Sequence, residues 1–178
     1  MTNKISSRAW ILLGVADFAK ARNFYETVME QEVGEVIDGG HVNYKSGIAL
    51  QRDYKGIVEG SGDFAAAPTG AKLEVKAKAN TYQLAFEVED IDYWQAKIKA
   101  SGAEMIHDVH EYLWGQRVIR FYDPDGHIIE LGEDLEVVAK RFLAQGLTAQ
   151  EVSDRFGYPL EYVQRLVGFS HEEDRKFK

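Results

Sequence analysis

The chain has 178 residues, of which 45% are hydrophobic and 12% aromatic, enough for one sizeable domain or for one domain with a small appendage. Its formal net charge of −8 disfavours nucleic acid as a partner, because phosphates attract Lys and Arg. The absence of cysteine excludes disulfides, thiolate nucleophiles and Cys-based zinc or iron–sulfur sites. The first apolar run, 10–15, is too short for a signal-peptide core or a membrane span, so we expect a soluble, cytoplasmic protein.

The first part of the chain predicts a strand, a helix and three short strands. The opening strand ends in Val15-Ala16-Asp17, and Asp17 is suited to cap a helix over roughly 18–30. Three strands are then expected at 33–38, 41–45 and 48–52. His41 lies beside a glycine-containing turn and is expected to be exposed.

A connection at 54–82 follows, in which glycine and alanine are frequent. A connection of this length is either mobile or functional, and both a lid and an ordinary surface linker are consistent with it. Leu73-Glu74-Val75 is suited to a short strand within it.

The same plan then repeats. A second apolar strand ends in Val88-Glu89-Asp90, and Asp90 precedes a predicted helix at 91–101 that stops at Gly102. A shift of 73 residues superimposes Asp17 on Asp90. The strands expected in this half are 104–109, 116–122 and 127–132.

The last two of these strands flank Asp123-Pro124-Asp125-Gly126. Pro124 fixes its φ near −65°, Gly126 tolerates a positive φ, and the aspartates can accept hydrogen bonds from nearby backbone N–H groups, so this is a turn. His127 is expected to be exposed beside it. Glu130 lies in the apolar run after the turn, where a lone carboxylate is costly unless it faces a cavity, a metal or a partner.

Residues 134–168 predict three helices. The first covers Leu135 to Ala144, and the second begins at Thr148, which forms a capping box with Glu151. The third begins at Leu160, and the second and third helices together resemble a helix-turn-helix. Residues 134–178 hold seven Lys and Arg against eight Asp and Glu, however, and this net charge of −1 disfavours DNA as a partner. A helical cap or a dimer contact is favoured instead, through these apolar residues: Leu160, Val163, Leu166 and Phe169.

The run Trp114-Gly115-Gln116-Arg117, the segment 121–126 and Glu130-Leu131 resemble the vicinal-oxygen-chelate superfamily, which includes glyoxalase I, bleomycin-resistance proteins and extradiol dioxygenases. The resemblance covers roughly 8–133. It implies an α+β domain at 1–133 with two tandem βαβββ modules (about 8–53 and 83–133, linker 54–82) forming a curved sheet or half-barrel around a groove, followed by a helical extension at 134–178. A generic α+β sandwich is the alternative.

In the resembled family, metal ligands come from the first and last strand of each module. Carried over by position, they fall on Trp10, Gln83, Gln51 and Glu130. Trp10 cannot ligate a metal, and Glu130 is the one anionic ligand, whereas catalytic metal sites use several strong ligands. We therefore expect no cofactor, with a divalent nickel, zinc, cobalt or manganese ion held by Glu130, Gln83 and Gln51 as the alternative.

Strand alternation places polar residues of the second module on one concave face. The candidates for catalysis there are Glu87, His107 and Glu130, because a histidine beside carboxylates is suited to proton transfer. The residues expected to bind a ligand are Trp10, Gln83, Trp114, Arg120 and Tyr122. His110 and Tyr112 either complete an aromatic lip with Trp114 or are simply packed. A salt-bridge network without chemistry is the alternative for the whole set.

These residues favour a protein that binds a small aromatic or amphipathic molecule in the groove, as bleomycin-resistance relatives do. The alternatives are a metal-dependent lyase or isomerase of lactoylglutathione-lyase type and a metal-free acid–base enzyme that uses Glu87 or His107. A third is a regulatory module whose tail is a partner surface. We expect a homodimer, and whether the protein is an enzyme stays open.

Overall fold

A computed structural model describes residues 11–37, 40–52 and 78–168 of the chain. The chain divides into two compact units, 1–81 with 123–127 and 82–122 with 128–178. Several sequence-based expectations lie outside the described residues: those for Trp10, Leu73-Glu74-Val75, Phe169 and most of the 54–82 connection. None of the helices formed by the described residues has the length and hydrophobicity to cross a membrane.

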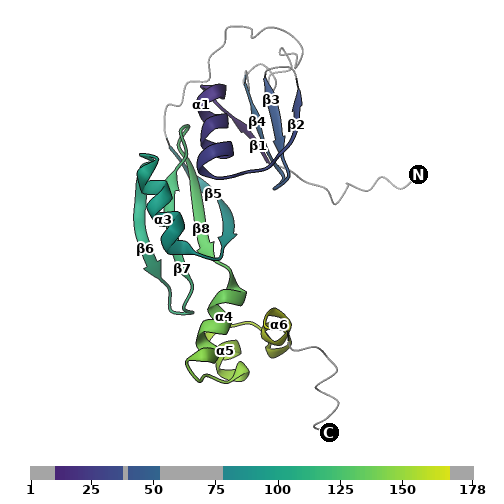
Figure 1. Cartoon of the computed structure of the whole chain (residues 1–178), viewed down its shortest axis with the longest axis vertical. Coiled ribbons are helices and arrows are strands. Elements are labelled where there is room, and N and C mark those ends of the chain that lie inside the picture. The colour runs from purple at the N-terminus through teal and green to yellow at the C-terminus, as the bar shows by residue number, and fades with distance from the viewer. Residues whose placement is uncertain (1–10, 38–39, 53–77, 169–178) are drawn as a thin grey trace, which may run out of the picture. The chain divides into compact units, whose positions relative to one another are not determined.

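The first unit contains a four-stranded sheet with the strand order β1-β4-β3-β2. Its strands are β1 (Ile11–Gly14), β2 (Val33–Ile37), β3 (His41–Tyr44) and β4 (Ile48–Gln51). β1 is parallel to β4, and β3 is antiparallel to both β2 and β4. The helix α1 (Phe18–Asn23) lies against β4 and continues as a π-helical turn, η1 (Phe24–Val28) (Figure 1).

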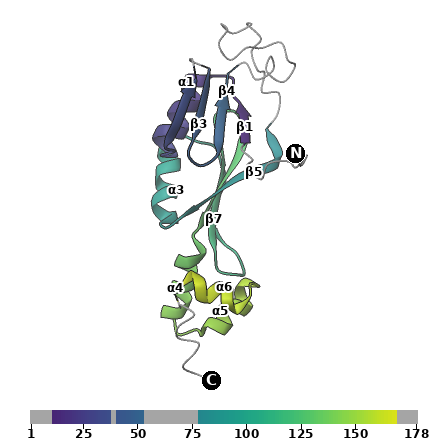
Figure 2. The ribbon, with the colours of Figure 1, turned by 90° about the vertical axis from the view of Figure 1, so that its right-hand side faces the viewer.

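The second unit repeats this topology, with the strand order β5-β8-β7-β6. Its elements are β5 (Ala79–Val88), α3 (Ile91–Ala100), β6 (Met105–Glu111), β7 (Arg117–Tyr122) and β8 (His127–Glu133). Each unit thus has a strand, a helix and three strands, and in each the first strand pairs with the last. The repeat predicted from the sequence is confirmed, with two open sheets in tandem βαβββ modules (Figure 1, Figure 2).

Both predicted helix caps are present. Asp17 accepts a hydrogen bond from the backbone N–H of Lys20 at 3.0 Å, and Asp90 accepts one from Tyr93 at 2.9 Å. Each bond satisfies a donor that the first turn of a helix leaves without an intrahelical partner. The Val-x-Asp pattern therefore marks the same strand-to-helix junction in both modules.

The second sheet has one apolar face, which packs against α3. The residues that bury this face are Leu84, Ile119, Phe121, Ile129 and Leu131, and α3 contributes Ile91 and Ile98. This agrees with the alternation of β5, β7 and β8. Val118 lies on the opposite face in strand register, yet it is 1% exposed.

The C-terminal segment forms the three predicted helices, α4 (Leu135–Ala144), α5 (Ala149–Phe156) and α6 (Leu160–Leu166). They enclose an apolar cluster of their own: Val138, Ala139, Phe142, Val152 and Val163. The capping box of Thr148 and Glu151 is confirmed. Val163 is buried in this cluster, so it is not available for the dimer contact suggested by the sequence.

The Asp123–Gly126 turn belongs to the first unit. Asp123 accepts hydrogen bonds from the Tyr25 hydroxyl at 2.8 Å, from the backbone N–H groups of Asp125 and His127 at 2.9 and 2.8 Å, and from His127 Nδ1 at 2.8 Å. Asp125 accepts one from the backbone N–H of Ala16 at 2.8 Å. The two aspartates therefore fasten this turn to the segments 15–17 and 24–28.

The expectation that His41 and His127 are exposed is wrong. The side chain of His127 is 12% exposed, because its bond to Asp123 draws it into the turn. Burial by itself lowers the pKa of His127, but the hydrogen bond and the charge of Asp123 outweigh it and raise the pKa above its ordinary value. His41 is buried between Gln51 and Asn43, with ring nitrogens at 2.8 and 3.0 Å from the two amide oxygens.

Replacing Asp123 by Ala should lower the free energy of unfolding by about 3 kcal/mol, because it leaves several buried hydrogen-bond donors without an acceptor. Urea denaturation followed by circular dichroism measures this. The matched control is Asp108→Ala, which removes an exposed carboxylate paired with Lys99 and should cost about 0.5 kcal/mol or less. Equal effects of the two substitutions would contradict the role of the turn.

Candidate functional site

Polar side chains gather on the face of the second sheet that lies opposite α3. They extend from three adjacent strands: Gln83 from β5, Glu130 from β8 and Arg120 from β7. Arg120 and Glu130 are directly opposite each other in the antiparallel β7–β8 pair. Cross-strand partners are the closest side-chain neighbours on a sheet, so this register sets the site.

Arg120 is the centre of the hydrogen-bond network. Its Nε donates to Gln83 Oε1 at 3.0 Å, and its Nη2 donates to Glu130 Oε2 in an ion pair. Its Nη1 donates to the Tyr112 hydroxyl at 2.5 Å and approaches His107 Nε2 at 3.1 Å. These contacts use four of the five N–H groups of a guanidinium. The Arg120 side chain is 23% exposed, so the network shields it from most of the solvent.

Two register shifts in β6 bring His107 to Arg120. Met105 is opposite Phe121, and regular pairing would then place His107 opposite Ile119 on the apolar face. A shift between Met105 and His107 places His107 opposite Arg120 instead, and a second one lies between His107 and His110. A β-bulge redirects a side chain in this way.

The contacts of His107 define its tautomer. Nε2 faces a guanidinium N–H and must accept, so it carries no hydrogen, while Nδ1 lies 2.7 Å from the carbonyl oxygen of Asp108 and must donate. The two contacts together select the tautomer with the hydrogen on Nδ1. The charged neighbour of His107 is Arg120 and not the carboxylate that the sequence suggested, and both ring nitrogens are occupied.

A row of aromatic rings continues from His107 along β6 and into the turn that follows it. The ring centroids of His107 and His110 are 6.3 Å apart, and those of His110 and Tyr112 are 4.8 Å apart, both edge to face. Tyr112 and Trp114 stack at 4.4 Å with 5° between their planes. Trp114 is 37% exposed, so this aromatic row ends in an accessible indole.

The two oxygens of Glu130 differ. Oε2 accepts from both Arg120 and Gln83, the latter at 2.9 Å, whereas no described residue donates to Oε1. The Glu130 side chain is 16% exposed. The acid therefore faces the polar network, as its place in an apolar run suggested, and keeps one oxygen free for another donor.

The structure brings together Gln83, His107, Arg120 and Glu130 of the predicted set, with Trp114 joined through Tyr112. Glu87 is exposed on β5, on the same face as Gln83, but hydrogen-bonds to no described residue. Tyr122 is half-buried on β7, two residues from Arg120. Trp10 lies outside the described residues. Gln51 is 2% exposed in the first unit, where it binds His41.

Tyr112 is the network member for which the sequence predicted an aromatic lip or simple packing and no hydrogen bond to Arg120. The alternation of His110, Tyr112 and Trp114 is the sequence signal that places the tyrosine ring beside the other two. Its hydroxyl reaches Arg120 because the chain turns back directly after it, where the backbone N–H of Tyr112 donates to the carbonyl of Gln116 at 3.0 Å.

The donor set fits a divalent metal poorly. Gln83 and Glu130 meet, but they provide one anionic ligand, and its Oε2 is engaged by a guanidinium. Across 11–37, 40–52 and 78–168, no group of three or more His, Cys, Asp or Glu side chains is arranged to hold a metal ion. Gln51 belongs to the other unit and is bonded to His41.

Residues 9–136 match the family of glyoxalase-like domains. No curated protein matches the chain. Similar solved structures include a protein of unknown function from Agrobacterium tumefaciens strain C58, with 28% identity and a TM-score of 0.61 over 74% of this chain and 96% of that one. Lactoylglutathione lyase from the same species has 21% identity and a TM-score of 0.53 over 74% of this chain and 96% of that one. A fosfomycin resistance protein from Listeria monocytogenes has 22% identity and a TM-score of 0.53 over 74% of this chain and 95% of that one.

A double-mutant cycle measures how strongly the central ion pair is coupled. With Arg120→Ala and Glu130→Ala, we expect a coupling of about 2 kcal/mol in the free energy of unfolding, because the pair is largely shielded. The comparison pair is Glu136 and Lys140, whose side chains are 45% and 60% exposed. That pair should give about 0.5 kcal/mol or less. Similar coupling in the two cycles would show that solvent screens Arg120 as it does a surface residue.

Proposed function

This chain belongs to the family of glyoxalase-like domains, and we propose that it binds a small molecule on the polar face around Arg120. The observation that carries the proposal is the free Oε1 of Glu130. Among the described residues, the buried side-chain atom without a hydrogen bond is Arg141 Nε, so Glu130 Oε1 is open to solvent and to a ligand. Here the protein satisfies one oxygen twice and supplies no described donor for the other, so a ligand donor has a defined place to bind.

The hydrogen-bonding groups that the network around Arg120 does not use indicate the chemistry of the ligand. Tyr112 accepts from Arg120, so the hydrogen of its hydroxyl is available to a ligand acceptor. Arg120 has one N–H left, and its charge is balanced by Glu130. An anion therefore gains little, and the site favours a neutral or cationic molecule with a donor for Glu130 and an acceptor for Tyr112.

The aromatic row supplies apolar surface next to these polar groups. Trp114 is stacked on Tyr112 on one side and partly exposed, and an indole face of this kind packs well against a planar ring. The proposed ligand is thus a small aromatic molecule with an amine or hydroxyl group. Apolar contact with a few well-placed polar groups is typical of small-molecule sites.

Two structural relatives have names that refer to small molecules, lactoylglutathione lyase and a fosfomycin resistance protein. At 21% and 22% identity the likeness is one of fold, and it supports the size class of the ligand. Binding is favoured over acid–base catalysis because both ring nitrogens of His107 are engaged and Glu87 is apart from the network. The homodimer, the cytoplasmic location and the role of Tyr122 in binding stay predictions.

A thermal-shift screen with aromatic amines and phenols, followed by calorimetry on the hits, tests this proposal. Glu130→Gln should weaken binding of an amine hit by about 10- to 100-fold, because it removes a charge-assisted hydrogen bond of roughly 1.5–3 kcal/mol. Tyr112→Phe should weaken it by about 5-fold. The control is Glu111→Gln, an exposed residue of β6 outside the network. Hits that bind both network variants as tightly as the unchanged protein would refute the proposed site.

The metal-dependent alternative has its own test. We propose that the site functions without a divalent ion, so nickel, zinc, cobalt or manganese should leave the unfolding midpoint of tag-free protein unchanged. Elemental analysis of the purified protein accompanies the titration. One equivalent of metal that disappears in Glu130→Gln would overturn this and favour the lyase or isomerase alternative, with Glu130 and Gln83 as ligands.

A further inference from the structure

We propose that the C-terminal helices position the binding site, with Arg141 of α4 as the positioning residue. The inference rests on the proposed function for its relevance to binding, and it deepens that function by assigning a role to residues beyond the matched family domain, which ends at 136. In brief, α4 holds the turn between β6 and β7, and this turn holds Tyr112 against Arg120. The contacts that carry it lie within the second unit.

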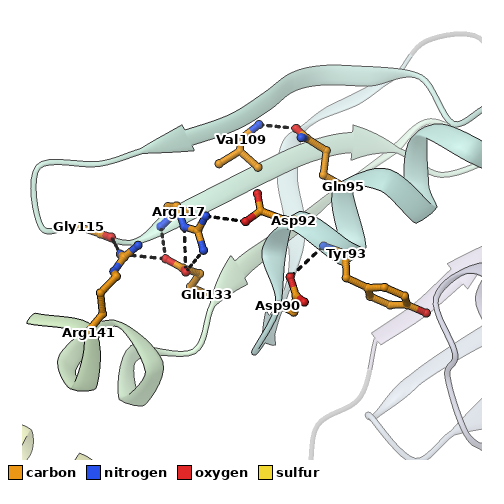
Figure 3. Close-up of polar contacts among 9 residues, drawn as sticks. All are labelled: Asp90, Asp92, Tyr93, Gln95, Val109, Gly115, Arg117, Glu133 and Arg141. Carbon is orange, nitrogen blue, oxygen red and sulfur yellow. Dashed lines mark hydrogen bonds and ion pairs between the residues drawn. The ribbon is translucent and has the colours of Figure 1, made fainter. Parts of the chain in front are cut away.

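The first contact is a buried carboxylate at the end of β8. Glu133 is 1% exposed, and its Oε1 accepts from Arg117 Nε and Nη2 at 2.9 and 2.6 Å. Its Oε2 accepts from Arg141 Nη2 at 3.1 Å and from the backbone N–H of Arg117 at 3.1 Å (Figure 3). The hydrogen bond to Glu133 raises the pKa of Arg117 above its ordinary range. The start of β7 and the last turns of α4 are thereby joined through one acid.

The second contact is between α4 and the turn itself. Arg141 Nη2 also donates to the carbonyl oxygen of Gly115 (Figure 3). Gly115 has φ +88°, and a Cβ at this position would overlap the ring of Phe142. Only glycine allows both this backbone conformation and the close approach of the helix. In both views the β6–β7 turn lies at the end of the sheet where α4 begins (Figure 1, Figure 2).

The third contact is a relay of hydrogen bonds from the aromatic row to the base of α4. Trp114 Nε1 donates to Gln116 Oε1 at 3.1 Å, and Gln116 Nε2 donates to the carbonyl oxygen of Glu133 at 2.8 Å. Glu133, the residue before the helix cap Asp134, therefore fixes the orientation of the indole through Gln116. Because Trp114 stacks on Tyr112, its orientation sets the plane of the tyrosine ring as well.

These contacts end at Arg120. The backbone N–H of Gly115 donates to the carbonyl of Tyr112 at 2.7 Å, so the residue held by Arg141 closes the turn that begins at Tyr112. The Tyr112 hydroxyl then accepts from Arg120 Nη1. Loss of Arg141 leaves Glu133 paired with Arg117, so no buried acid is stranded. Its expected effect is a looser turn and not a broken core.

Arg141→Gln tests the inference without any ligand. In a full-length Trp10→Phe, Trp94→Phe background, Trp114 is the sole tryptophan, and acrylamide should quench it more readily in Arg141→Gln. Amide hydrogen exchange at Tyr112 and Gly115 should accelerate by about 5-fold, which is the effect expected when one hydrogen bond that holds the turn is lost. The Arg120 Nη1–H resonances, assigned by their disappearance in Arg120→Lys, should also exchange faster, because Nη1 donates to the Tyr112 hydroxyl, which is no longer fixed.

The matched control is Arg155→Gln. Arg155 lies over the same Phe142 ring, 4.7 Å from its centroid, but has no hydrogen bond to the described residues of the turn, so all three readouts should match the unchanged protein. Arg141→Lys keeps one charge beside Glu133 but cannot bond both partners as a guanidinium does, so it should be intermediate. It also serves as the test variant where Arg141→Gln does not fold.

Two results would overturn the inference. One is an Arg141 variant whose Trp114 quenching and turn exchange match the unchanged protein. The other is a loosened turn with unchanged Arg120 Nη1–H signals, since the extension would then hold the turn without reaching the site. Failure of the proposed function is seen separately, in ligand binding that survives Glu130→Gln and Tyr112→Phe.

Discussion

A guanidinium on a β-sheet must have its charge and its N–H groups satisfied, and the second unit is organised around this requirement. Arg120 has Glu130 for its charge and Gln83, His107 and Tyr112 for three further N–H groups. These partners come from β5, β6, β8 and the end of the β6–β7 hairpin. The register of the strands, the bulges of β6 and the path of the turn are therefore all constrained by one side chain. What the protein offers to a ligand is what this network leaves unsatisfied.

Features governed by local chemistry were predictable from the sequence. Asp17 and Asp90 cap helices because a carboxylate before a helix has backbone donors within reach, whatever the rest of the fold does. The apolar face of β7 and β8 follows from alternation with period two. The strand order is not local and was not predicted; the two βαβββ modules came from the resemblance that the repeated plan and the 114–131 motif support.

Features that depend on distant partners were not predictable in the same way. His127 is drawn from solvent by an acid that is itself held by Tyr25, about a hundred residues earlier in the chain. His107 was placed on the correct face, but alternation alone cannot give the bulges that select Arg120 as its partner. Tyr112 was recognised as an aromatic and not as a hydrogen-bond partner, because its role depends on where the turn directs its hydroxyl.

A single residue, Asp134, connects the last strand of the second sheet to the C-terminal helices. Glu133 ends β8, Asp134 caps the next helix, and α4 begins at Leu135. A residue added or removed at this non-helical position would displace α4 by up to about 3.5 Å, carrying Arg141 and Phe142 off Gly115. Homologous proteins that retain this architecture should thus keep a capping side chain at Asp134 and conserve the spacing from Glu133 to Arg141, so that chain length is under selection at this junction as well as residue identity.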